Sequence, residues 1–447
     1  MARRRHWLLT ALVVGVVAGG VALPIVNGQR AEQAWVTGIE SVDAMLEGDY
    51  GRPSGVESRV YERGLFSAQA RARIRLAAPA VSPALAAALG NDRGEVVLTL
   101  EQTIEHGLLG IRFDGHLIPH DRLATQLGRF VADPAEAVRV GGKVNLQMRQ
   151  LRVSTVPLSG LIEADEPLVL DAAPLRLELS FEPDEKRLDT LLDWPGMTLD
   201  APEQGGELRV DDVSLNSTGR LVAGDLLNGL WVGRSELRLG DMAARSPMEP
   251  PVRLAELSVT ANSEAADNGR IDAGLGLRFS RLSLPEFPVV RGQARWQLRS
   301  LAAEPLMALS RMAPALEDSS TLPAQARGYL ADLAAAGPVL TLESMRLETE
   351  AGTGLSSTGR VTVDPAMAEA MRAGTRGMAL LRHLDMTAAM GLDQSLGDAL
   401  PAEPAAWLAQ LQAFGIVRRQ AGEYRIEAAL ERGTLTINDR PWWRLDG

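Results

Sequence analysis

Residues 68–76, AQARARIRL, alternate strictly between apolar and polar side chains. Successive side chains of a β-strand point to opposite faces of the sheet, so this stretch predicts a strand with one apolar and one wetted face. Strands of this kind are typical of antiparallel sheets that expose one face to water.

The same period of two recurs along the chain, so antiparallel sheet is expected to dominate the fold. The apolar positions of the further strands are Val144, Leu146 and Met148; Leu175, Leu177, Leu179 and Phe181; Leu275, Leu277 and Phe279; and Leu340 and Leu342. Glycines mark two hairpins. One turns through Gly352 and Gly354 between residues 340–350 and 360–363, and one turns near Gly433 between residues 424–430 and 435–437.

Helical patterns are fewer and lie mainly in the C-terminal third. One passes through Tyr329 and Leu333 and ends at Gly337 and Pro338, a glycine cap followed by a proline stop. The other predicted helices cover residues 121–132, 305–316, 367–383 and about 404–415. Long runs of strands with inserted helices indicate an α+β fold rather than a regular alternation of strand and helix.

The N-terminal segment has the composition of a membrane anchor. Residues 8–26 are almost entirely apolar or small, and their number is close to the ~20 residues that cross ~30 Å of hydrocarbon. Arginines at positions 3–5 precede them, which by the positive-inside rule keeps residues 1–7 in the cytoplasm and exports the rest. The predicted fold class is therefore a β-dominated α+β fold with long, mostly antiparallel sheets and inserted helices, preceded by a single N-terminal transmembrane helix.

A signal peptide cleaved after Ala22 is the alternative for this segment. A one-faced apolar stripe of helical spacing follows it and favours a retained anchor. The stripe consists of Trp35, Ile39, Val42 and Leu46.

Composition excludes several classes of function. The chain of 447 residues has no cysteine, which excludes disulfides, thiolate metal ligands, a cysteine nucleophile and a lipoprotein anchor. Its formal net charge of −11 argues against nucleic-acid binding. We expect a periplasmic β-rich region over residues 31–242 and a periplasmic α+β region over residues 252–447. Prolines at 247, 250 and 251 suggest a linker over residues 243–251, and one continuous domain is the alternative.

No group of residues predicts a catalytic, cofactor or metal site. His116 and His120 are separated by four residues, but Pro119 interrupts a helix there, and on a strand they would lie ~13 Å apart. His106 ends a predicted strand and is interpreted as a turn histidine, with a base or ligand role as the alternative. Carboxylate neighbours such as Asp211 and Asp212 are interpreted as solvated charge.

Tryptophans are frequent among the few aromatic residues. Trp231, Trp296 and Trp407 lie in apolar periodic contexts and are predicted to anchor the core. Trp442 and Trp443 adjoin Pro441 near the C-terminus. For this pair, simple docking onto the body competes with a role as a hydrophobic lid or a partner contact.

Three short segments resemble one family. Residues 60–67, VYERGLFS, resemble the signature near the N-terminus of the YdgA-like bacterial envelope family, which is defined by a domain of unknown function. Residues 104–107, IEHG, resemble its His-Gly turn, with Leu108 where proline is usual. Residues 422–439 are similar to its closing hairpin, with Asp439 where glycine is typical. The resemblance implies a bacterial inner-membrane anchor, a large periplasmic domain and no established catalytic residues.

The leading hypothesis is a non-enzymatic, inner-membrane-anchored protein whose periplasmic body is an envelope scaffold or interaction module, with the membrane, a lipid or an envelope protein as partner. One alternative is that an open β-sheet groove binds lipid acyl chains or another hydrophobic ligand. A second is an envelope hydrolase that uses carboxylates or His106. A long open apolar groove would favour lipid, a closed core would favour a scaffold, and a polar pocket would favour catalysis.

Overall fold

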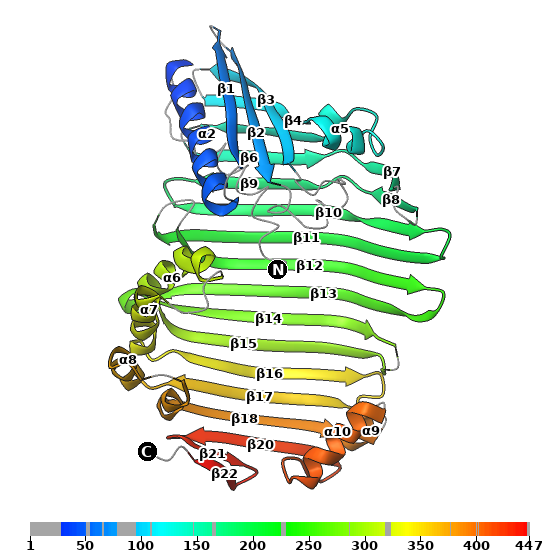
Figure 1. Ribbon diagram of the computed structural model, residues 1–447, viewed down its shortest axis with the longest axis vertical. Helices are drawn as coiled ribbons and strands as arrows, with labels where there is room; N and C mark the ends of the chain where they lie inside the picture. The colour runs from blue at the N-terminus through cyan, green and yellow to red at the C-terminus, as the bar shows by residue number, and fades with distance from the viewer. Residues whose placement is uncertain are drawn as a thin grey trace. The chain divides into compact units, whose positions relative to one another are not determined.

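Antiparallel strands dominate the structure, a computed structural model (Figure 1). The structure describes residues 28–50, 54–64, 67–77, 95–107, 110–145, 147–162, 167–224, 229–285, 287–317, 323–375, 377–398, 400 and 402–444. The β-dominated, antiparallel character predicted from the sequence is confirmed. The predicted transmembrane segment, residues 8–26, lies outside the described residues, and no helix within them is long and apolar enough to cross a membrane.

Contacts divide the chain into two units, Met1–Leu221 and Val222–Gly447. In the first unit, strands β1 to β6 pair antiparallel in chain order, β6 then pairs with β9, β9 with β10, and β10 with β11. Strand β7 pairs with β8, and β8 pairs with the second half of β10. The strands are β1 (Gly55–Arg63), β2 (Ser67–Ala77), β3 (Glu95–Gly107), β4 (Gly110–Pro119), β5 (Val138–Val144), β6 (Arg149–Thr155), β7 (Leu158–Ile162), β8 (Leu168–Ala172), β9 (Arg176–Glu182), β10 (Arg187–Ala201) and β11 (Gly206–Ala223). The helices are α2 (Gly28–Tyr50), α5 (Asp121–Leu127) and the short η2 (Pro134–Glu136).

The core of the first unit lies between α2 and the sheet. The predicted stripe on α2 packs against the apolar positions of β2, and both sets are 0–6% exposed. Trp35 also donates a hydrogen bond of 3.0 Å from its indole Nε1 to the buried Gln102 on β3. The alternation of residues 68–76 is therefore the pattern of a strand whose apolar face is fully covered.

The second unit is an antiparallel meander. Strands β12 to β18 pair in chain order, β18 pairs with β20, and β20 pairs with both β19 and β21 before β22 closes the sheet. The strands are β12 (Leu230–Ser246), β13 (Glu249–Ala266), β14 (Arg270–Ser283), β15 (Val290–Ala302), β16 (Val339–Thr349), β17 (Gly354–Val363), β18 (Leu384–Asp393), β19 (Arg418–Gln420), β20 (Glu423–Glu431), β21 (Thr434–Ile437) and β22 (Arg440–Arg444). Both predicted hairpins are confirmed as β16–β17 and β20–β21.

In the sequence, helices connect several of these strands, and they pack at the ends of the strands. They are η3 (Asp267–Gly269), α6 (Ala303–Glu317), α7 (Ala324–Ala335), α8 (Ala366–Arg372), η4 (Gly377–His383), α9 (Gln394–Asp398) and α10 (Ala402–Ala413). Gly337, at φ 64°, follows the end of α7 as the sequence predicts. A left-handed conformation of this kind favours glycine.

Two helix predictions are too long. The helix predicted over residues 367–383 is divided into α8 and η4, because Gly374 and Gly377 adopt φ values of 87° and 62°, which interrupt a right-handed helix. The helix predicted over residues 121–132 ends at Leu127, after which Phe130 bonds back to Leu127 and accepts a hydrogen bond from Ser159 N.

The strand predicted through Val144 and Met148 is also wrong. The Asn145 side chain accepts hydrogen bonds from the backbone of Gln147 and Met148, at 3.0 and 2.7 Å, and so turns the chain between β5 and β6. Asparagine side chains that bond two or three residues ahead are typical of turns.

Residues 243–251 do not form the expected linker but the ends of β12 and β13 and the turn between them. Pro250 and Pro251 lie at the start of β13, opposite an irregularity in register between Ala244 and Ser246. Proline is tolerated at such positions because no ladder hydrogen bond requires its missing N–H. The predicted linker therefore reflected proline content alone.

Candidate apolar binding surface

An apolar face crosses the strands of the second unit. Residues directly opposite each other in neighbouring antiparallel strands share one face of a sheet, so the register defines rows of side chains. One row is Leu275, Trp296, Leu342, Gly359, Ala388, Ala428 and Ile437; the next is Leu237, Val259, Leu277, Ala294, Met345, Ser357, Met390 and Ile426; the third is Ala273, Leu298, Leu340, Val361, Met386, Leu430, Leu435 and Trp443. We call these residues the apolar face, and Ser357 is the one member with a polar group other than the two indoles. Where the register continues beyond them, the next residues on the same face are Ala261 and Ser235, Ser263, and Arg440.

Much of the apolar face is open to solvent. Leu275 and Leu340 each keep 43% of their surface exposed, and Met386 and Met390 are also exposed. Most of the remaining side chains in the three rows are only half-buried. Apolar side chains this exposed over several neighbouring strands form a contiguous patch, and such patches mark interaction or ligand-binding surfaces.

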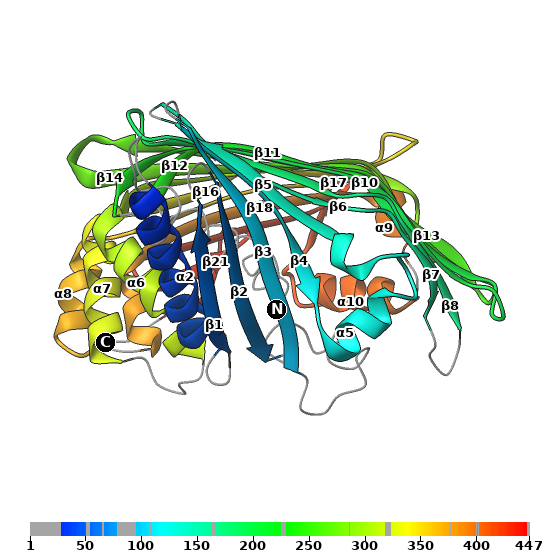
Figure 2. The ribbon, with the colours of Figure 1, turned by 90° about the horizontal axis from the view of Figure 1, so that it is seen from above.

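Helices pack at both ends of the strands that form the apolar face. At one end, α7 and α8 pack small alanines around Val363, the last residue of β17. At the other end, the Tyr424 hydroxyl donates a 2.9 Å hydrogen bond to Asp398 at the end of α9, and this hydrogen bond, with burial, raises the pKa of Tyr424. Within the second unit, Figure 2 shows α7 and α8 at one end of the strands and α9 and α10 at the other. No helix described in the second unit covers the middle rows between them.

A smaller apolar surface lies on α10. Its hollow of about 450 Å³ is lined by Leu400, Glu403, Pro404, Trp407, Leu408 and Leu411. Trp407 is 62% exposed, so its prediction as a core anchor is wrong. Leu408 turns inward toward Gly397, and because consecutive residues of a helix do not face the same way, Trp407 turns outward. Trp231 and Trp296 are half-buried on β12 and β15.

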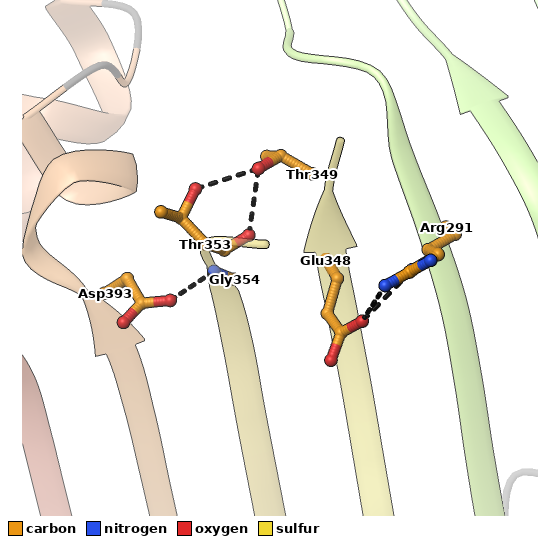
Figure 3. A network of polar contacts seen from close by, with 6 residues as sticks. All are labelled: Arg291, Glu348, Thr349, Thr353, Gly354 and Asp393. Atoms are coloured by element: carbon orange, nitrogen blue, oxygen red, sulfur yellow. Dashed lines mark hydrogen bonds and ion pairs between the residues drawn. The ribbon is translucent and has the colours of Figure 1, made fainter. Parts of the chain in front are cut away.

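The opposite face of the same strands is polar. A hollow of about 460 Å³ there is lined by residues that include Glu343, Arg360, Thr387 and Glu427. Ion pairs cross this face, as between Arg291 on β15 and Glu348 on β16 at 2.8 Å (Figure 3). The two faces of the sheet therefore differ sharply in polarity.

A polar network holds the rows in register near the β16–β17 turn (Figure 3). The Thr349 hydroxyl lies 2.8 Å from the Thr353 hydroxyl and 3.1 Å from the Thr353 carbonyl oxygen across the turn. The Gly354 N–H donates to the Asp393 carboxylate at the end of β18. Register matters here because a shift by one residue would move every apolar side chain of β17 to the polar face.

The three histidines that were candidates for catalysis or metal binding each contact different residues and do not form a common site. His106 is on β3, where its Nε2 atom is buried without a hydrogen-bond partner among the described residues. His116 Nδ1 lies 3.4 Å from a Glu136 oxygen, whereas His120 Nε2 lies 2.6 Å from the Thr99 hydroxyl. Within the described ranges, no group of three or more ligating side chains could hold a metal ion. The carboxylates of Glu101 and Asp211 pair instead with neighbouring arginines at 3.0 and 2.6 Å.

The family follows from comparison of the sequence with family models. The model of a bacterial family described as "bacterial protein of unknown function (DUF945)" matches residues 6–442. The chain belongs to the DUF945 family. The match covers nearly the whole chain and confirms the family-level prediction made from residues 60–67, 104–107 and 422–439. No curated protein and no solved structure shows significant similarity to this DUF945 member.

The structure explains one departure from the DUF945 pattern. Asn438 and Asp439 join β21 to β22 with φ values of 49° and 63°, the left-handed pair of a type I′ turn. Such a turn favours glycine at its second position, and aspartate is one of the residues that tolerate it. The closing hairpin is therefore kept although Asp439 replaces the typical glycine. Leu108 lies outside the described residues.

Sequence reasoning missed several strands of the apolar face. The alternation of Met386, Ala388, Met390 and Leu392 with smaller or polar residues indicates a strand, β18, that was not predicted. The long strands β10 to β13 have less regular alternation and were missed too. No local pattern reveals whether a predicted apolar face is covered, because coverage depends on where other elements pack.

Proposed function

We propose that this protein is a non-enzymatic envelope protein that binds lipid acyl chains along the apolar face of its second unit. The observation that carries the proposal is the exposure of Leu275, Leu340 and Met386 within three continuous apolar rows. We further propose that residues 8–26 anchor the chain in the bacterial inner membrane, with the bulk of the chain in the periplasm.

The dimensions of the apolar face suit an acyl chain. The row from Leu275 to Ala428 crosses five strand spacings, which at ~4.8 Å each give roughly 24 Å. One leaflet of a bilayer contributes about half of a ~30 Å hydrocarbon core, so an extended acyl chain needs roughly 15 Å. A single row can therefore accommodate the length of one chain.

The chemistry of the face favours hydrocarbon over a protein partner. Protein interfaces carry about one hydrogen bond per 100–200 Å². The three rows offer only the Ser357 hydroxyl and the indole N–H groups of Trp296 and Trp443, and their backbone groups are committed to the sheet. Burial of hydrocarbon contributes about 0.8 kcal/mol per CH₂ group. An acyl chain can gain this free energy without hydrogen-bonding partners, so it fits the face better than a polar peptide does.

The test compares two neighbouring residues of β18 that point to opposite faces. Met386 belongs to the apolar face, while Thr387 pairs with Arg360 on the polar face. The full-length protein and the variants Met386→Asp and Thr387→Asp are purified in mild detergent, and bound lipid is quantified by mass spectrometry. We expect wild type and Thr387→Asp to carry similar amounts of lipid. Met386→Asp should carry at least about tenfold less, because a carboxylate is costly to bury against hydrocarbon.

Lipid held by the N-terminal segment is common to all three proteins, so the difference between the variants isolates the apolar face. Equal lipid content in Met386→Asp and Thr387→Asp would overturn the proposal. If wild type instead carries a bound polypeptide and no lipid, and only Met386→Asp loses that polypeptide, the scaffold hypothesis is supported.

A further inference from the structure

The C-terminal hairpin of the second unit presents exposed aromatic residues. Trp442 and Trp443 on β22 are 43% and 38% exposed, and every residue of this strand is exposed. Phe414, just after α10, is 69% exposed. Among the described strands, β22 pairs only with β21, so this group lies at the final edge of the sheet.

Asn438 joins the segment that follows Phe414 to the turn that precedes β22. Its side chain is buried and donates hydrogen bonds of 3.3 and 2.8 Å to the carbonyl oxygens of Gly415 and Ile416. Its Oδ1 atom accepts a 2.9 Å hydrogen bond from the backbone of Glu427. Phe414 therefore projects from a segment that is bonded directly to the turn preceding Trp442.

Two cations flank the tryptophans. Arg440 and Arg444 lie at the two ends of β22, and neither side chain has an ion pair or hydrogen bond within the described part of the chain. The nearby Asp439 and Glu427 pair with other arginines, Arg418 at 3.8 Å and Arg425 at 2.8 Å. Two further carboxylates are close to Arg444 in sequence or in register: Asp446 follows it by two residues in the sequence, and Glu431 pairs with Thr434, which pairs with Arg444.

We propose that this edge of the sheet, defined by Phe414, Arg440, Trp442, Trp443 and Arg444 and called the C-terminal tip, docks edge-on against an anionic lipid bilayer. Tryptophan is enriched at membrane–water interfaces because its ring is apolar and its N–H is polar. Arginines near an anionic surface add attraction. Exposed indoles next to two arginines that form no ion pair with the described residues fit an anionic headgroup layer.

The inference goes beyond the proposed acyl-chain binding. Trp443 ends the third row of the apolar face, so a bilayer at the C-terminal tip would contact the same surface along which acyl chains are proposed to lie. Docking does not require acyl-chain binding, and the experiments measure the two separately: bound lipid reports the apolar face, and vesicle contact reports the C-terminal tip.

The first experiment uses the absence of cysteine in the chain. Trp442→Cys and Met248→Cys each introduce a single labelling site for an environment-sensitive fluorophore. Met248 is a matched control because it is 95% exposed at the tip of another hairpin of the same unit. Vesicles of phosphatidylcholine, with or without phosphatidylglycerol, are added to each labelled full-length protein.

We expect a blue shift at position 442 with phosphatidylglycerol vesicles, little shift with phosphatidylcholine alone, and no shift at position 248. Equal shifts at both positions would show nonspecific adsorption and overturn the proposal. The absence of a shift at position 442, or the same shift with neutral and anionic vesicles, would overturn it as well.

A second experiment tests the charges. Each arginine near an anionic surface contributes about fivefold in affinity, so Arg440→Gln with Arg444→Gln is expected to weaken binding to phosphatidylglycerol vesicles by roughly 25-fold. The variant with both arginines changed to lysine keeps the charges and is expected to bind like wild type. Equal loss in both double variants would indicate a structural defect of the hairpin and contradict the electrostatic role.

Discussion

Both units contain strands that alternate apolar and polar side chains, but the apolar face is covered in the first unit and exposed in the second. On β2 in the first unit, the apolar side chains of residues 68–76 are 0–6% exposed beneath the stripe of α2. On β14 to β18 in the second unit, the apolar side chains form rows of equal continuity, but Leu275 and Leu340 remain 43% exposed. Alternation thus specifies that a strand has an apolar face and leaves open what covers that face.

The difference depends on where the helices are placed. The helix α2 runs along β1 in the antiparallel direction and inserts Trp35, Ile39 and Leu46 into the core of the first unit. The helices of the second unit pack at strand ends, around Val363 and Tyr424, and leave the middle rows open. We therefore expect stability to be concentrated in the covered face and ligand binding in the open one.

The largest expected effect is on the covered core. Ile39→Ala removes a side chain that is 1% exposed and should lower the free energy of unfolding of the first unit by about 2–5 kcal/mol. Leu275→Ala, on the apolar face, should change the stability of the second unit by less than about 0.5 kcal/mol. Urea unfolding of the full-length protein, followed by fluorescent labels placed in each unit, measures both.

A similar loss of stability from Ile39→Ala and Leu275→Ala would break the comparison, because it would show that the two faces are covered to the same extent. A smaller effect of Ile39→Ala alone would mean that α2 contributes little to the core.

The next largest effect concerns the polar contact under α2. Trp35→Phe keeps an aromatic ring but removes the indole N–H, which leaves the Gln102 side chain buried without this donor. An unsatisfied buried group costs about 1–3 kcal/mol. Adding Gln102→Leu to Trp35→Phe should recover part of the loss, and a double-mutant cycle by urea unfolding tests this coupling. Strictly additive effects would contradict a direct contact.

The smallest effect is a pH dependence at Tyr61 on β1, which packs 5.8 Å from the Trp35 ring. Burial, reinforced by Glu32, raises the pKa of Tyr61 from 10.0 to about 12. The folded state therefore holds this proton more tightly than the unfolded state, and the associated stability is present below pH 10 and is lost as the pH rises toward 12. In Tyr61→Phe this loss should be absent.

The measurement is the difference in unfolding free energy between wild type and Tyr61→Phe at pH values from neutral to about 12. The buried Tyr61 hydroxyl has no hydrogen-bond partner among the described residues, so the phenylalanine variant should be at least as stable as wild type at neutral pH. A difference that does not change with pH would contradict the raised pKa.

Local patterns predicted the elements better than their packing. The strand at 68–76, the stripe of α2 and the glycine-turned hairpins follow from short-range rules, because side-chain period and turn conformation are local properties. The strand through Met148 and the long helix over 367–383 failed where Asn145 and Gly374 imposed turns that apolar spacing alone does not show. The exposure of Trp407 could not be predicted, because it depends on which side of α10 meets α9.

Only part of the candidate site could be predicted from the sequence. Alternation at Leu275, Leu277 and Leu340 supplied several of its side chains, and an open groove was among the alternatives considered. Rows arise only when register aligns distant strands, as the pairing of Trp296 with Leu342 illustrates. Register and coverage are long-range properties, so the site required the structure.

Ser356 and Ser357 provide the most direct test of the central claim, that the apolar face of the second unit binds acyl chains. They are neighbours on β17 with the same side chain, but Ser357 lies in the row with Met345 and Met390, and Ser356 pairs with Arg346 on the polar face. Ser356→Cys and Ser357→Cys are labelled separately with a fluorophore, and a fatty acid carrying a quencher on its chain is titrated into each full-length protein. The account predicts saturable quenching at position 357 and little at position 356. Equal quenching at the two positions, or none at position 357, would contradict it.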